Sequence, residues 1–270
     1  MFGTLLSYEI RSRARAVARV LEIIVAAIVL SLVVVALNIP VLSDSALRIT
    51  YILCCGIPAG FLIAGMIDYW KTLYGQRGYF MMTLPVSGSS ILWAKITRIC
   101  LESLVGLAFA VGGIAATAAE DASRKGMSLA QYTADIRGVL AVFPTSMLIA
   151  LAVAQVISTL AVVVQACAVM TIGAEGRFNH MGFGAPMIGF IILYFVNQAL
   201  GVVGTLFLPL SINLRTGRLS ADIMWTSFLS MTSDTPPEVV GLGSFILGPL
   251  FAIVMAIWAS RSIEKHTSLR

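Results

Sequence analysis

The feature that most constrains this chain is a series of six apolar runs, each long enough to cross a lipid bilayer as an α-helix. A helix that crosses a hydrocarbon core of about 30 Å needs about 17 to 25 mostly apolar residues. The runs extend from Val20 to Asn38, Ile49 to Ile67, Ile99 to Ala118, Val139 to Ile172, Met187 to Leu210 and Leu242 to Ala259. We therefore predict an all-α integral membrane protein with six transmembrane helices.

Composition favours a single membrane domain over residues 1–270. Apolar residues make up 59% of the chain and charged residues 11%, against about 25% charged residues in an average soluble domain. The runs are spread from end to end, so no separate soluble domain is expected. The fourth run is too long for a simple span, and Pro144 near its start predicts a kink or a start outside the membrane core. Its membrane part is predicted as Ser146 to Val169.

The basic residues predict the orientation of the spans. If the N-terminus is cytoplasmic, twelve of the 18 Lys and Arg residues fall on the cytoplasmic side and six on the other. The positive-inside rule favours this orientation, which places both termini in the cytoplasm. The net charge of +5 then reflects topology. We expect a multi-pass protein of the cell membrane that does not bind nucleic acid.

Residues 1–19 are predicted to form a helix in the cytoplasmic interface of the membrane. Apolar residues recur at spacings of three and four, at Phe2, Leu5, Leu6, Ile10, Ala14, Val17 and Leu21. The opposite face carries Ser7, Arg11, Arg15 and Arg19. Such a helix is expected to contact acyl chains and lipid phosphates before it turns into the first span. The alternative is a basic topology signal that needs no defined helix.

The cytoplasmic segment between the second and third runs is too apolar for an ordinary loop. Its large apolar side chains are Tyr79, Phe80, Met82 and Leu84. They cannot all be solvated cheaply, so this piece is predicted to dock on lipid or on a partner. Pro85 ends any helix formed before it. Ser87 or Ser89 can then cap a new helix that continues into the third span.

The segment from Arg77 to Ser87 reads Arg-Gly-Tyr-Phe-Met-Met-Thr-Leu-Pro-Val-Ser, and Ile91, Leu92 and Lys95 follow it. This pattern resembles the first cytoplasmic loop of ABC type-2 permeases, the membrane subunits of exporters for drugs, antimicrobial peptides and polysaccharides. The resemblance implies a coupling loop over residues 71–95, whose short coupling helix, roughly Gly78 to Leu84, sits in a groove of an ATP-binding subunit. The implied contact residues are Arg77, Gly78, Tyr79, Phe80, Met81, Met82, Thr83 and Leu84. Related permeases often have an acidic residue shortly before the glycine, where this chain has Gln76.

The same resemblance implies partners and a class of substrate. It implies two copies of an ABC ATP-binding subunit and a second permease subunit, either the same or a paralogous chain, paired by the two-fold symmetry that is commonest in oligomers. The implied substrate is hydrophobic or amphipathic, such as a drug, an antimicrobial peptide or a lipid, which would make antibiotic resistance one outcome of transport. The chain has no G-x-x-x-x-G-K-S/T phosphate loop, so we expect no cofactor in this chain and ATP with Mg²⁺ in the partner.

Small residues in the second and fifth runs have two interpretations. They are Gly56 and Gly60 in the second run and Gly201 and Gly204 in the fifth. Small residues let helices approach closely, which favours packing within the chain. The other interpretation is a dimer seam, because the second and fifth spans of type-2 exporters line the subunit interface.

Polar residues at membrane depth are either structural or functional. Gln155, Ser158, Thr159 and Gln165 lie in the fourth run, and Asn197 and Gln198 in the fifth. Hydrogen bonds between helices, each contributing about 0.6 to 2 kcal/mol, are the simpler explanation. The alternative is a substrate path that includes Asn197, Gln198 and Gln155.

Two carboxylates lie one turn inside the membrane. Glu22 and Glu102 occupy the cytoplasmic ends of the first and third runs. Carboxylates at this depth are suspected of function, but we expect structural ion pairs rather than a proton relay. The available cations are Arg19, Arg98 and Lys95.

Residues 211–238 are predicted to form an external loop with a short amphipathic or re-entrant helix. Its apolar residues are Leu219, Ile223, Met224, Trp225 and Phe228, and Trp and Phe are favourable in the membrane interface. Type-2 exporters have short external helices at this position, so the resemblance implies a cap on the exit path. The four cysteines all lie in apolar runs and are expected to pack as small hydrophobes, with no metal site.

The alternatives to an exporter are an enzyme and a non-transporting scaffold or sensor. An enzyme is not expected, because the chain has no H-E-x-x-H motif and only two histidines, His180 and His266, both near helix ends. A non-transporting scaffold or sensor, which recruits cytoplasmic partners through the same apolar loop, also fits the sequence.

Overall fold

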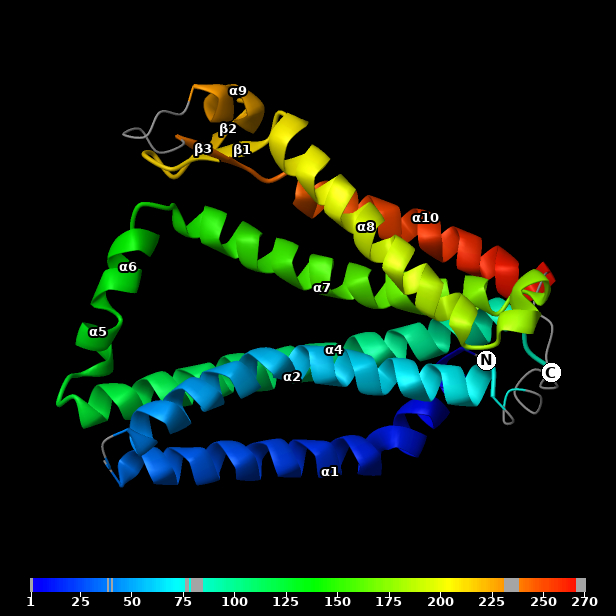
Figure 1. The fold of residues 1–270 in the computed structure, drawn as a ribbon, viewed down its shortest axis with the longest axis horizontal. Coiled ribbons are helices and arrows are strands. Elements are labelled where there is room, and N and C mark those ends of the chain that lie inside the picture. Colours follow the sequence, from blue (N-terminus) through cyan, green and yellow to red (C-terminus); the bar gives the residue numbers. More distant parts are fainter. Residues whose placement is uncertain are drawn as a thin grey trace. The chain divides into compact units, whose positions relative to one another are not determined.

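The computed structural model describes residues 2–37, 39, 41–75, 78, 85–230 and 238–265, with the main chain alone at residue 179. It is mostly helical (Figure 1). Six helices are long and apolar enough to cross a membrane: α1 (Phe2–Ala36), α2 (Leu42–Leu73), α4 (Gly88–Arg124), α7 (Thr145–Gly173), α8 (Gly184–Phe207) and α10 (Ser244–Lys265). Apart from their ends they match the six predicted runs. The chain is therefore a multi-pass, mostly helical membrane protein with the six spans that its sequence predicted.

The chain forms two compact units. The first contains Met1–Tyr69 and Ser90–Arg137, and the second contains Trp70–Ser89 and Gly138–Arg270. Helices α2 and α4 each contribute to both units. The loop between these two helices belongs to the second unit, whereas most of their length belongs to the first.

The core of the first unit is apolar and is formed by α1, α2 and α4. Its buried centre consists of Ile57, Phe61 and Ala110, and α1 packs against it through Val17, Leu21, Ile24 and Ile28. Gly106 of α4 permits the close approach of Phe61, because a Cβ atom at this position would lie 2.7 Å from the phenyl ring. A glycine in the middle of a helix thus serves helix packing here.

Helix α1 runs without a break from Phe2 to Ala36. The helix predicted over residues 1–19 is present and is continuous with the first span, and α1 bends in its N-terminal part (Figure 1). In this part Glu9 is 4% exposed and forms an ion pair with α4. This contact directs the first half of α1 into the helix bundle of the first unit.

Helices α7, α8 and α10 pack together in the second unit. Helix α7 begins directly after Pro144, which occupies the N-cap position, so the predicted start of the fourth span after this proline is confirmed. Glycines bring α7 and α8 close together. A Cβ atom on Gly173 would lie 2.8 Å from the nitrogen of Pro186, and one on Gly189 would lie 2.7 Å from Val169.

The connection between α8 and α10 contains both a helix and a small sheet. Helix α9 (Met224–Leu229) confirms the predicted short helix, and Trp225 stacks on Phe207 with a centroid separation of 5.3 Å. The sequence did not predict the three strands β1 (Ser211–Asn213), β2 (Leu219–Ser220) and β3 (Val239–Gly241). They pair antiparallel in the order β2-β1-β3 next to α9 (Figure 1). Strands this short show no detectable alternation of apolar and polar residues in the sequence.

The connection between α4 and α7 is helical in part and contains a buried carboxylate. It includes α5 (Leu129–Tyr132) and α6 (Ala134–Leu140). Asp121 at the end of α4 is 4% exposed. It accepts hydrogen bonds from Lys125 Nζ at 2.8 Å and Tyr132 Oη at 2.7 Å. The hydrogen bond to Asp121, together with burial, raises the pKa of Tyr132.

Candidate functional site

The predicted coupling segment falls mostly outside the described residues. Arg77 and Tyr79, Phe80, Met81, Met82, Thr83 and Leu84 belong to the undescribed part of the chain. Gly78 is described and buried, and its amide donates a hydrogen bond to the carbonyl oxygen of Gly75 at 2.8 Å. The described part of this site consists of the helix ends on both sides of the segment.

Both ends of this loop contact other parts of the second unit. Before the loop, Trp70 packs edge-on against Phe183 of the α7–α8 connection, with centroids 5.1 Å apart. After the loop, α4 begins at Gly88, directly after Ser87, which is one of the two predicted cap positions. The other, Ser89, lies inside the helix. Ser89 donates a hydrogen bond to Glu264 near the end of α10. The residues on both sides of the loop thus contact the α7–α8 connection and the end of α10 in the same unit.

A buried cluster of ion pairs lies in the first unit, within the first four turns of α4. Lys95 Nζ is 2.8 Å from Glu9 Oε1, and Arg98 Nε is 3.3 Å from Glu9 Oε2. Arg98 also contacts Asp68 Oδ2 of α2 at 2.8 Å and Glu102 Oε1 at 2.7 Å. One guanidinium therefore joins carboxylates from α1, α2 and α4.

The ion-pair cluster has balanced charges and is largely buried. Arg98 and Lys95 are each 1% exposed. Arg13 completes the cluster, because its Nη1 lies 3.5 Å from Asp68 Oδ1, so three cations face three carboxylates. Buried charges are tolerated only when they are paired and hydrogen-bonded. The cluster consequently fixes the relative positions of the three helix ends in the first unit.

The predictions for the two intramembrane carboxylates had different outcomes. The ion pair of Glu102 with Arg98 is confirmed. Glu22 is exposed, and no ion pair of Glu22 occurs among the residues that the structure describes. The contribution of Glu9 was missed. Its signal was present in the sequence, because Glu9 is an acid on the same helical face as Phe2 and Leu6.

The predicted substrate-path residues do not lie together. Asn197 donates a hydrogen bond from Nδ2 to Gln165 Oε1 at 2.8 Å, and Gln165 Nε2 donates to the carbonyl oxygen of Gly248 at 3.0 Å. Asn197 therefore belongs to a polar contact among α7, α8 and α10. Gln198 is exposed and bonds to Tyr194 of its own helix at 3.1 Å. Gln155 is exposed on α7.

Replacing Asn197 with leucine tests the structural interpretation of this residue. We expect the free energy of unfolding to fall by about 0.6 to 1.7 kcal/mol, because one hydrogen bond between membrane helices is lost. Titration of bicelle-embedded protein with dodecyl sulfate measures this quantity. The matched control is Gln198→Leu, which removes only an exposed bond within one helix. Equal stability of both variants and the wild type would contradict the assignment.

The glycines of the predicted dimer seam have different surroundings. A Cβ atom on Gly204 would lie 2.8 Å from the backbone of Gly243, so this residue serves packing within the second unit. The other three, Gly56, Gly60 and Gly201, have nothing within 4 Å of such an atom. Gly56 and Gly60 are one turn apart on an exposed face of α2 that also carries Ile52 and Ile63. They are free to contact lipid or another helix.

Comparison of the chain with protein-family models, with curated proteins and with solved structures found no match.

Proposed function

We propose that this chain is the permease subunit of an ABC exporter in the cell membrane. In this role it pairs with a second permease subunit, identical or paralogous, and with two ATP-binding subunits. ATP and Mg²⁺ bind to those partners, and the chain itself performs no catalysis. The substrate is hydrophobic or amphipathic, as expected for a path between apolar helices. The resemblance of the segment from Arg77 to Ser87 to type-2 permeases is the origin of the proposal.

One structural observation supports the proposal most directly: α4 is a single uninterrupted helix from the end of the loop through the buried ion-pair cluster to Arg124. Its 37 residues correspond to about 55 Å at 1.5 Å per residue, well beyond a hydrocarbon core of about 30 Å. A push on the loop is therefore carried along a stiff element. Through Arg98 the same displacement reaches α1 and α2.

The mechanism that follows is mechanical. Closure of the two ATP-binding subunits displaces the loop, and α4 moves with α1 and α2 as one body because the cluster resists separation. Such rigid-body motion between two packed arrangements is a common form of conformational switching. The outward path opens when the two permease subunits rearrange. The free energy for this motion comes from the difference in binding of the loop to the closed and the open ATPase.

Co-expression of this chain with its genomic neighbours, followed by a search for a co-purifying ATPase, tests the proposal. We expect Phe80→Asp and Leu84→Asp to abolish the recovery of the ATPase and of its activity, because a carboxylate in an apolar groove is costly to bury. The matched controls are Phe228→Asp and Leu229→Asp in α9. Both control residues are exposed, and their connection lies on the other side of the membrane from the loop.

The controls are expected to retain the wild-type yield of ATPase. Recovery of no ATPase with the wild-type chain, or equal recovery with the loop variants, would contradict the exporter. Recovery of a different cytoplasmic protein that is lost in Phe80→Asp would instead favour the scaffold or sensor.

A further inference from the structure

Two adjoining cavities lie in the second unit where α7, α8 and α10 meet the short helix η1 (Gly176–Met181). The larger has a volume of about 520 Å³ and the smaller about 370 Å³. Both are within the range of about 300 to 1,000 Å³ that ligand sites occupy. Trp258 of α10 lines both cavities, so they are two compartments on either side of one side chain.

The larger cavity is lined only by apolar side chains and glycine. Ile172 of α7, Met181 of η1 and Met255 of α10 contribute to its walls. Ile188 and Ile192 of α8 line it too, and both are about half exposed, at 47% and 58%. In a membrane-spanning chain such exposed apolar side chains contact lipid. The cavity is therefore accessible from the acyl region of the bilayer.

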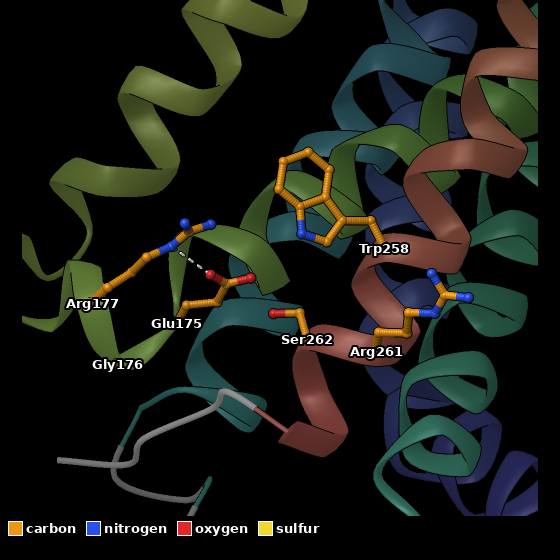
Figure 2. A pocket seen from close by; sticks show the side chains of 6 residues that line it. All are labelled: Glu175, Gly176, Arg177, Trp258, Arg261 and Ser262. Atoms are coloured by element: carbon orange, nitrogen blue, oxygen red, sulfur yellow. Dashed lines mark ion pairs between the residues drawn. The ribbon is translucent and has the colours of Figure 1, made fainter.

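The smaller cavity is lined in part by charged side chains and carries a net positive charge. Figure 2 shows Glu175 and Arg177 of the α7–α8 connection turned towards each other, with Trp258, Arg261 and Ser262 on α10. Arg177 Nε is 2.7 Å from Glu175 Oε2, so this pair is neutral. Arg261 is exposed, extends away from the pair, and has no ion pair among the residues that the structure describes.

The remaining charge of the site is thus the guanidinium of Arg261. The nearest acid on the same helix face, Glu264, accepts a hydrogen bond from Ser89. Arg177 is engaged with Glu175 and also lies over the ring of Phe178, 4.6 Å from its centroid. The net positive charge of the site favours an anion, and a guanidinium group such as that of Arg261 binds phosphate in a planar, bidentate geometry.

We propose that these two cavities bind an anionic phospholipid of the cytoplasmic leaflet. An acyl chain occupies the apolar cavity, and the phosphate lies against Arg261 at the edge of the smaller cavity. The α7–α8 connection is on the same side of the membrane as the chain termini, the side with twelve of the 18 basic residues. Anionic lipids are concentrated in the cytoplasmic leaflet, and basic pockets between helices on this side bind their headgroups. The inference does not depend on the exporter proposal.

Quenching of Trp258 fluorescence by brominated lipids tests the site. The experiment uses the full chain with Trp70, Trp93 and Trp225 replaced by Phe, reconstituted in vesicles of phosphatidylglycerol and phosphatidylcholine. Bromine is placed on the acyl chains of one lipid at a time. We expect phosphatidylglycerol to associate with the site about fivefold more strongly than phosphatidylcholine, as one net basic charge near the membrane surface predicts.

The discriminating variants change one exposed charge. In Arg261→Gln the preference for phosphatidylglycerol should disappear, because the site becomes neutral, whereas Arg261→Lys should keep it. The matched control is Arg11→Gln, an exposed arginine of α1 on the same side of the membrane, which should retain the fivefold preference. Equal quenching by both lipids in the parent protein, a preference that survives in Arg261→Gln, or no quenching by either lipid would each overturn the proposal.

Discussion

Replacing Arg98 with methionine is expected to lower the free energy of unfolding by about 3 to 5 kcal/mol, because removing one member of a buried ion-pair network leaves its partners uncompensated. Arg98 is 1% exposed and contacts three carboxylates. Methionine fills much of the same volume as arginine. The fall in the free energy of unfolding therefore measures the loss of the charge and not the creation of a cavity. Unfolding of bicelle-embedded protein by dodecyl sulfate measures the change.

The matched control for Arg98→Met is Arg48→Met, because Arg48 is an exposed arginine of α2. Its free energy of unfolding should stay within about 0.5 kcal/mol of the wild type, as for most surface substitutions. A double-mutant cycle of Glu9→Gln and Lys95→Met adds a second measurement. Lys95 Nζ lies 2.8 Å from Glu9 Oε1, so the losses of unfolding free energy in the two single variants should not add up in the double variant. An Arg98→Met protein as stable as the control would show that the cluster does not hold the helices together.

Replacing Trp93 with proline is expected to separate ATPase binding from movement of the permease. Trp93 lies in α4 between the loop and Lys95. Proline there removes the hydrogen bond to the carbonyl of Ser89 and costs about 3 kcal/mol or more of helix stability. The loop should still recruit the ATPase. The broken helix should no longer pass the displacement to the ion-pair cluster.

Spin labels on the far side of the membrane measure this uncoupling. Ser123 at the end of α4 and Thr216 between β1 and β2 are exposed, and cysteines there report the distance between the two units when the native cysteines are replaced. In the wild-type complex ATP should change that distance, and in Trp93→Pro the change should be absent although the ATPase co-purifies. Trp93→Ala, which keeps the helix, should behave like the wild type. An ATP-dependent change that persists in Trp93→Pro would contradict transmission through α4.

Several features of the molecule were predictable from local sequence alone. The six spans follow from run length and apolarity, since a helix in lipid needs little information beyond its own composition. The start of α7 after Pro144 agrees with the fixed backbone of proline, and the start of α4 after Ser87 agrees with the preference for serine at helix N-caps. The pair of Glu102 with Arg98 was predictable because residues four apart share a helix face.

Other features depended on contacts between residues that are distant in the chain. Glu9 and Lys95 are 86 positions apart, so their pairing, and with it the course of the first half of α1, is visible only once α1 and α4 pack together. The hydrogen bond of Asn197 to Gln165 likewise depends on the packing of α8 against α7. Strands β1 to β3 have two or three residues each, too few for any periodicity. Local sequence determined where this chain crosses the membrane, because a span depends on its own residues. Tertiary structure decided which buried polar groups meet, because each such group needs a partner that another helix supplies.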